Sequence, residues 1–137
     1  MLRFAIAAGL LVLAGCGEEP PKPSGKAVIS FALTEFSYAF RNSRHTYFHQ
    51  RVFSETGGVV VTIVRGRVCV VDGANCVDAL VNYRIEASKN LVQKGHHVAT
   101  PKAKDRITLH YWAEDDAGNK FEFEKILRTD NKTITVE

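Results

Sequence analysis

The histidines are the side chains of this sequence that most readily suggest a metal site. His45 and His49 are four residues apart, a spacing that places two imidazoles on one face of a helix. The aromatic residues around them favour a strand, on which an even separation also keeps them on one face. Together with His96 or His97, in an expected loop after Gly95, they would form a composite copper or zinc site. Surface histidines without a metal are the commoner arrangement, and Met1, the only methionine, gives copper no support.

Motifs of common hydrolases are missing from the sequence. Ser88-Lys89-Asn90 lacks the Ser-x-x-Lys spacing of penicillin-binding enzymes, and no Gly-x-Ser-x-Gly segment occurs. Asp115 and Asp116 could hold calcium, but an EF-hand loop needs further oxygen ligands at alternate positions, so a turn is the preferred interpretation. We therefore expect a protein that is not an enzyme and binds no metal.

Two cysteines, Cys69 and Cys76, flank an Asp72-Gly73 pair. Asp-Gly is a strong signal for a two-residue hairpin turn. If these two residues form the turn, the cysteines face each other on neighbouring strands, within reach of disulfide geometry. A zinc or redox pair would have Cys-x-x-Cys spacing and a second pair. The spacing therefore predicts a structural disulfide.

The first 16 residues read as an export signal that ends in a third cysteine. A positively charged start is followed by an uncharged run over residues 4–14 that is too short to span a bilayer. The order Leu13-Ala14-Gly15-Cys16 resembles the lipobox of bacterial lipoproteins. This resemblance implies a signal peptide over residues 1–15. It also implies a diacylglycerol on the sulfur of Cys16 and an acyl chain on its new amino terminus.

The lipobox resemblance also implies a location. Gly17 stands where an aspartate would retain a proteobacterial lipoprotein in the inner membrane, so we expect a lipid-anchored outer-membrane protein that faces the periplasm. Two or more acyl chains make such anchoring stable, and this covalent lipid is the only cofactor expected. Residues 16–26 include three prolines and would form a flexible tether.

Length indicates the number of domains, and the distribution of charge bears on the kind of partner. Of the 137 residues, 122 would remain after loss of the 15-residue signal, which favours one domain over residues 27–137. The formal net charge is +3, and basic and acidic residues are interspersed. No basic stripe indicates a nucleic-acid partner.

From residue 27 onward, apolar residues recur with a period of two, which indicates strands rather than helices. The phase slips near Thr34-Glu35, as a bulge or a strand that changes sheets would require. Residues 105–113 alternate cleanly, and residues 121–128 would pair with them. The polar segment 88–104, broken by Gly95 and Pro101, is expected to hold short strands or a loop.

The final hairpin carries a second resemblance. Residues 111–119, Tyr-Trp-Ala-Glu-Asp-Asp-Ala-Gly-Asn, resemble the last hairpin of bacterial immunoglobulin-like domains. About eight short strands with regular turn signals fit one all-β domain, an immunoglobulin-like β-sandwich. The sequence departs from the antibody pattern, because no cysteine pair spans the two expected sheets.

A five-residue loop over 115–119 would set the register of this hairpin. His110 then faces Glu124, and Trp112 faces Glu122, with all four side chains directed away from the core. An outward tryptophan is either covered by another part of the chain, for which segment 88–104 is the candidate, or available to a partner.

The sequence thus predicts a non-catalytic protein-binding or assembly module whose partner is another envelope protein. Its candidate binding face consists of His110, Trp112, Glu122 and Glu124. Two alternatives remain open. One is an inhibitor of a cell-wall lytic enzyme that inserts a loop from segment 88–104. The other is a periplasmic copper or zinc carrier that uses the histidines.

The lipid anchor can be tested by Cys16→Ser. Because only the thiol can accept the diacylglycerol, we expect the variant to remain uncleaved or to become soluble. Fractionation with a carbonate wash, followed by mass measurement, reports both outcomes. Recovery of the variant in the washed membranes at the wild-type level would exclude the anchor.

Overall fold

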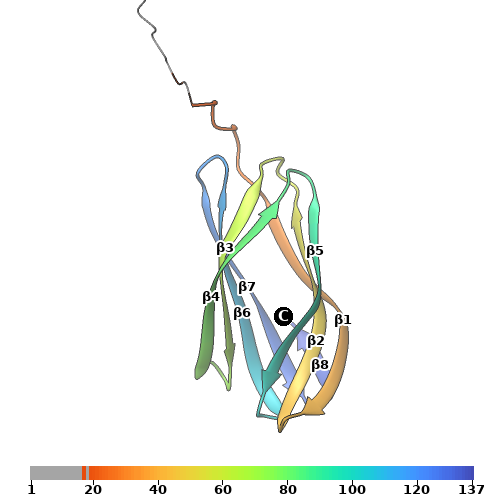
Figure 1. Ribbon diagram of the computed structural model, residues 1–137. Coiled ribbons are helices and arrows are strands. Elements are labelled where there is room, and N and C mark those ends of the chain that lie inside the picture. The colour runs from red at the N-terminus through yellow and green to blue at the C-terminus, as the bar shows by residue number, and fades with distance from the viewer. Residues whose placement is uncertain (1–16, 18) are drawn as a thin grey trace, which may run out of the picture.

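The computed structural model describes Gly17 and residues 19–137 (Figure 1). The expected signal peptide and the lipobox, including Cys16, lie outside these residues. Gly17 and residues 19–28 form neither helix nor strand. The described part of the chain has no helix long and apolar enough to cross a membrane.

Eight antiparallel strands form two sheets, so the predicted all-β fold with two sheets is confirmed (Figure 1). The strands are β1 (Ile29–Arg41), β2 (Arg44–Glu55), β3 (Val61–Val70), β4 (Asn75–Ile85), β5 (Asn90–Thr100), β6 (Lys104–Asp115), β7 (Lys120–Asp130) and β8 (Thr133–Val136). The three-stranded sheet has the order β1-β2-β5, and the five-stranded sheet has the order β4-β3-β6-β7-β8. Seven strands have 10 to 13 residues, longer than the short strands that the turn signals suggested.

Of two predictions about individual strands, the bulge in the first strand is confirmed and the expectation of short strands or a loop over residues 88–104 is wrong. The phase slip in β1 is a bulge, because the register with β2 shifts between Thr34 and Ser37 and Glu35 adopts a φ of 55°. Segment 88–104, expected as short strands or a loop, instead contains the 11-residue strand β5. β5 lies at a sheet edge, and its pairing with β2 shifts register near Gly95, so its apolar pattern is weak and interrupted.

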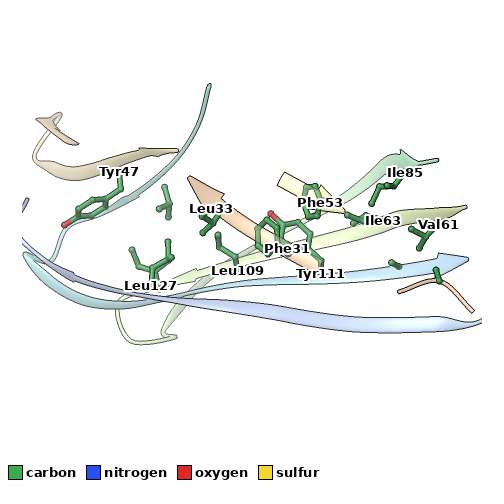
Figure 2. Close-up of a cluster of buried hydrophobic side chains, with 14 of the residues drawn as sticks. Phe31, Leu33, Tyr47, Phe53, Val61, Ile63, Ile85, Leu109, Tyr111 and Leu127 are labelled. Carbon is green, nitrogen blue, oxygen red and sulfur yellow. The ribbon is translucent and has the colours of Figure 1, made fainter. Parts of the chain in front are cut away.

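The core lies between the sheets and is built from alternate residues of each strand. An aromatic cluster occupies its centre, with ring centroids 4.7 Å apart for Phe31 and Phe53 and 5.1 Å apart for Phe31 and Tyr111 (Figure 2). Phe123 of β7 stacks on Tyr111 at 5.6 Å. Each buried aromatic ring contributes roughly 1.5 to 3 kcal/mol through loss of apolar surface from water. This cluster therefore holds the two sheets together.

Glu55, at the end of β2, is buried although it carries a charge. Its carboxylate accepts hydrogen bonds from the backbone N–H groups of Val28, Gly57, Gly58 and Ser88. Burial alone would raise the pKa of Glu55, but these four donors lower it from 4.5 to about 2. One carboxylate thus fixes the start of β1 and two loops at the end where the chain enters the sandwich.

Two further buried carboxylates act in the same way. Asp115 accepts the N–H of Ala27 at 3.0 Å and that of Asn119 at 2.8 Å, so Asp115-Asp116 belongs to a turn, as preferred above. At the opposite end of the sandwich, Asp105 accepts the N–H groups of Val71 and Asp72 at 2.9 and 2.8 Å. Burial opposes ionisation of both aspartates, but the hydrogen bonds prevail and lower each pKa.

The role of Glu55 predicts a specific acid sensitivity. Because its pKa is lower in the folded chain than its ordinary value, ionised Glu55 stabilises the fold above about pH 4.5, and this stabilisation is lost as the pH falls towards 2. Glu55→Gln should cost on the order of 3 kcal/mol at pH 7. Between pH 4.5 and 2 the variant should also lose less stability than the wild type. Urea unfolding across this range measures both effects.

The control is Glu19→Gln, which changes an exposed carboxylate outside the strands. Its stability should follow the wild-type curve at every pH. If the Glu55→Gln curve also ran parallel to the wild-type curve, the proposed role of Glu55 would be wrong.

Candidate functional site

The predicted register of the final hairpin is confirmed. His110 pairs with Glu124, Tyr111 with Phe123 and Trp112 with Glu122 across β6 and β7. Tyr111 is buried in the core, so its neighbours His110 and Trp112 lie on the outer surface of the five-stranded sheet. The four residues of the candidate binding face therefore stand side by side on that surface.

Trp112 is half-buried, but segment 88–104 does not cover it, because β5, which makes up most of that segment, belongs to the other sheet. The guanidinium of Arg65 lies 4.4 Å from the Trp112 ring, and that of Arg67 lies 5.6 Å away. The His110 ring is 4.2 Å away, and the indole Nε1 donates to Glu122 at 2.5 Å. The expectation of cover by segment 88–104 is therefore wrong, and side chains of the same sheet provide the cover.

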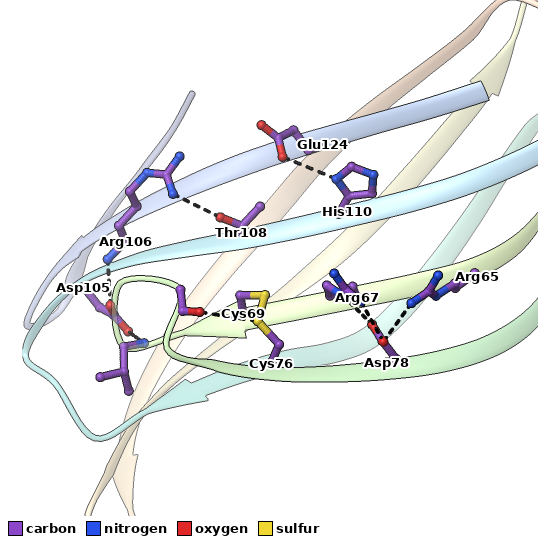
Figure 3. Close-up of a disulfide and its surroundings, with 12 residues drawn as sticks. Arg65, Arg67, Cys69, Cys76, Asp78, Asp105, Arg106, Thr108, His110 and Glu124 are labelled. Atoms are coloured by element: carbon purple, nitrogen blue, oxygen red, sulfur yellow. Dashed lines mark hydrogen bonds and ion pairs between the residues drawn. A yellow bond between two sulfur atoms is a disulfide. The ribbon is translucent and has the colours of Figure 1, made fainter.

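The two arginines are themselves held by one acid on the edge strand β4. Asp78 accepts bonds of 2.6 and 2.9 Å from Arg67 and of 2.8 Å from Arg65 (Figure 3). The hydrogen bonds from Arg67 and Arg65 hold the pKa of Asp78 well below its usual range. This cluster was not predicted from the sequence. The pairing of Cys69 with Cys76 could have predicted it. In the same register, the residues two positions further from the turn on each strand are Arg67 and Asp78, which therefore face each other.

The predicted disulfide joins β3 to β4 on the same outer surface (Figure 3). Cys69 and Cys76 face each other with Cα atoms 4.1 Å apart. The N–H of Ala74 donates to the carbonyl of Val71 at 3.0 Å, which closes the expected turn. The bridge keeps the outermost strand of the sheet attached near its first residues.

β4 forms one edge of the five-stranded sheet, with β3 as its only neighbour among the described strands. Val77 and Leu80 on this strand are apolar but 73% and 89% exposed. Beside Leu80, a hollow of about 430 Å³ extends across β3 to Trp112. Long, apolar sheet edges are unusual in stable monomers because their free N–H and C=O groups pair readily with another strand.

The histidines lie on strands rather than partly in a loop. His96 and His97 belong to β5, where His96 faces His49 of β2 and His97 faces Phe48. His49 is buried, and this burial, with the nearby Arg51, lowers its pKa from 6.5 to about 4. His45 lies near the start of β2, and its Nδ1 is 2.9 Å from the Tyr38 hydroxyl.

Only two of the four histidines are thus brought together, His49 and His96. Within the described part of the chain, no three His, Cys, Asp or Glu side chains gather as metal ligands would. The composite copper or zinc site therefore has no assembled ligand set among these residues.

Comparison with known proteins identifies the fold alone. No protein-family model matches the chain, and no curated protein matches its sequence. Several solved chains have a similar fold, among them the following two. The proposed ApaA protein from Bordetella pertussis has a TM-score of 0.59 and 12% identity, over 83% of this chain and 95% of that one. The X-ray structure of structural genomics target SoR45 has a TM-score of 0.54 and 11% identity, over 82% and 90%.

Because Trp112 is only half-buried beneath its neighbours, its replacement should have a moderate effect on the stability of the fold. Trp112→Ala should lower the free energy of unfolding by about 1 to 2 kcal/mol, because cation–π contacts and one hydrogen bond are lost on a partly wet surface. Trp112→Phe, which keeps a ring under Arg65, should lose less. Urea denaturation measures both, and a loss above about 4 kcal/mol for Trp112→Ala would place this side chain in the core.

Proposed function

We propose that this chain is a bacterial envelope lipoprotein that works as a non-catalytic protein-binding or assembly module. In this proposal, lipid on Cys16 anchors it in the outer membrane on the periplasmic side. Residues 16–26 are the tether, and the immunoglobulin-like sandwich is the binding domain. The partner is another envelope protein. The lipobox resemblance supports the anchor, and the similarity of the final hairpin supports the immunoglobulin-like type.

The observation that carries the binding function is the exposed edge of β4. Val77 and Leu80 present large apolar side chains to solvent on a strand that has no neighbour on its outer side among the described residues. Alternate backbone N–H and C=O groups of such an edge point away from the sheet. An extended segment of a partner can bind them by adding a sixth strand, with apolar side chains against Val77 and Leu80.

The outer surface next to this edge offers a second contact region for a partner. Arg65 and Arg67 are both held there by ion pairs with Asp78. The adjacent hollow reaches Trp112, an aromatic side chain of the kind that contributes much binding energy at protein interfaces. A partner strand on β4 would place its outward side chains beside this hollow.

The structure offers no comparable support, within the described residues, for the lytic-enzyme inhibitor or for the metal carrier. The inhibitor hypothesis relied on a loop in segment 88–104, most of which is β5. The metal-carrier hypothesis relied on histidines of which two are brought together.

The edge can be tested by placing a photo-crosslinking amino acid at position 80 in the native envelope. Position 40 is the control, because Phe40 is also exposed, at 61%, but lies on β1 of the other sheet. We expect one envelope protein to crosslink through position 80 and not through position 40. Adding Val77→Lys should reduce the yield at least tenfold, about 1.4 kcal/mol, because a charge replaces an apolar contact.

Hydrogen exchange of the purified pair then separates strand addition from other contacts. Backbone amides of residues 75–80 should become protected on binding, while those of β1 do not change. Equal crosslinking through positions 40 and 80, or a complex that leaves residues 75–80 unprotected, would rule out the edge as the binding site.

A further inference from the structure

Arg51 on β2 is a buried cation that lies between the sheets. It is only 8% exposed, and its side chain points inward with those of its neighbours His49 and Phe53. Its Nε donates to Nε2 of His49 at 3.4 Å, and its guanidinium lies 5.9 Å from the Tyr111 ring. Among residues 19–137, no Asp or Glu oxygen lies within 4.0 Å of this guanidinium.

Such an isolated charge is unusual, because buried ions in proteins are normally paired. The nearby histidines do not share its positive charge at pH 7. Burial first, and Arg51 second, lower the pKa of both His49 and His96, which leaves the imidazoles neutral. The interior therefore contains one positive charge that nothing in the described chain neutralises.

A small pocket lies at Arg51. It has a volume of about 130 Å³, and its walls include Gly66, Val68, Ala79, Tyr83 and Tyr111 of the five-stranded sheet. A cavity of this kind needs roughly 10 to 15 Å³ to hold one water molecule, so the pocket has room for several. The pocket can therefore hold a small polar group and the first atoms of its stem.

The Tyr111 hydroxyl is a second unused donor in this region. Tyr111 is 3% exposed, and its hydroxyl has no hydrogen-bond partner within the described chain. An unpartnered buried hydroxyl costs about 1 to 3 kcal/mol. The Tyr111 ring packs closely over Gly66, where an added Cβ would lie 3.1 Å from the ring. It also packs against the rings of Phe31, Phe53 and Phe123. A rigid phenol and a guanidinium thus border the same cavity.

We propose that this pocket, the Arg51 pocket, binds a carboxylate group. The guanidinium retains N–H donors in a planar fork that matches the two oxygens of a carboxylate, and the Tyr111 hydroxyl supplies a further donor. Val77 of the β4 edge also lines this pocket, so the two sites are neighbours. The carboxylate site itself requires no partner strand on β4.

Charge favours a carboxylate over a more highly charged anion. Arg67 also borders the pocket, but its guanidinium is already bound to Asp78, which it shares with Arg65. One buried cation without an acid calls for one negative charge, and the pocket has room for a carboxylate group and the first atoms of its stem. The carboxylate can come from a small free acid or from an acidic side chain of a bound protein segment.

The test is an NMR titration of the full soluble domain with sodium acetate, matched in ionic strength by sodium chloride. We expect saturable shifts of the Arg51 Nε–Hε and Tyr111 ring signals, with chloride giving none. Arg51→Met should abolish the shift of the ring. Arg65→Met, which removes an arginine from the outer surface, should leave it unchanged. Tyr111→Phe should weaken binding about tenfold while keeping Arg51 in place.

A second titration distinguishes the sources of the carboxylate. Blocked glutamate, N-acetyl-Glu-N-methylamide, should bind more tightly than acetate if the natural ligand is an acidic side chain, and less tightly if it is a free acid. Blocked glutamine should bind in neither case. The proposal is overturned if acetate and blocked glutamate both fail to shift Arg51, if glutamine binds as well as glutamate, or if Arg51→Met retains binding.

Discussion

The sandwich depends on buried carboxylates that accept backbone N–H groups. Glu55 and Asp115 do this at the end where the chain enters, and Asp105 does it at the end that carries the Val71–Ala74 turn. Loops between long strands have backbone donors that the sheets cannot satisfy, and an ionised oxygen satisfies several at once. The aromatic core holds the sheets together, but these acids determine how the strands are joined.

Arg51 differs from these three acids, because its buried charge has no acidic partner among the described residues. Glu55, Asp105 and Asp115 are buried charges whose hydrogen bonds favour ionisation. Arg51 is comparably buried, but its one hydrogen bond among the described residues goes to a neutral imidazole. On the outer surface, the two arginines share the carboxylate of Asp78, and all three side chains are partly exposed to water, so no charge there is isolated as that of Arg51 is.

Local pattern explains which features could be predicted from the sequence. The alternation of apolar and polar residues over 105–113, together with the five-residue loop over 115–119, predicted the pairing of Trp112 with Glu122. The Asp-Gly turn predicted the disulfide. β5 was missed because an edge strand with a bulge has little apolar period. The Arg51 pocket was out of reach, because it joins β2 to strands of the other sheet, and no counting along a hairpin relates them. The Arg67–Asp78 pair was within reach by such counting.

The chain enters the sandwich at the ends of its strands, and this direction has a mechanical consequence (Figure 1). The N–H of Ala27 is bound to Asp115, so a pull on the preceding residues reaches β6 as well as β1 and acts along the strand axes. A partner strand paired with β4 would be loaded in shear. A force along the strands would load all of its hydrogen bonds to β4 at once, whereas a force perpendicular to the strands would break them one after another. If the chain is anchored through Cys16 as proposed, this arrangement lets the domain bear tension between the lipid anchor and a bound partner.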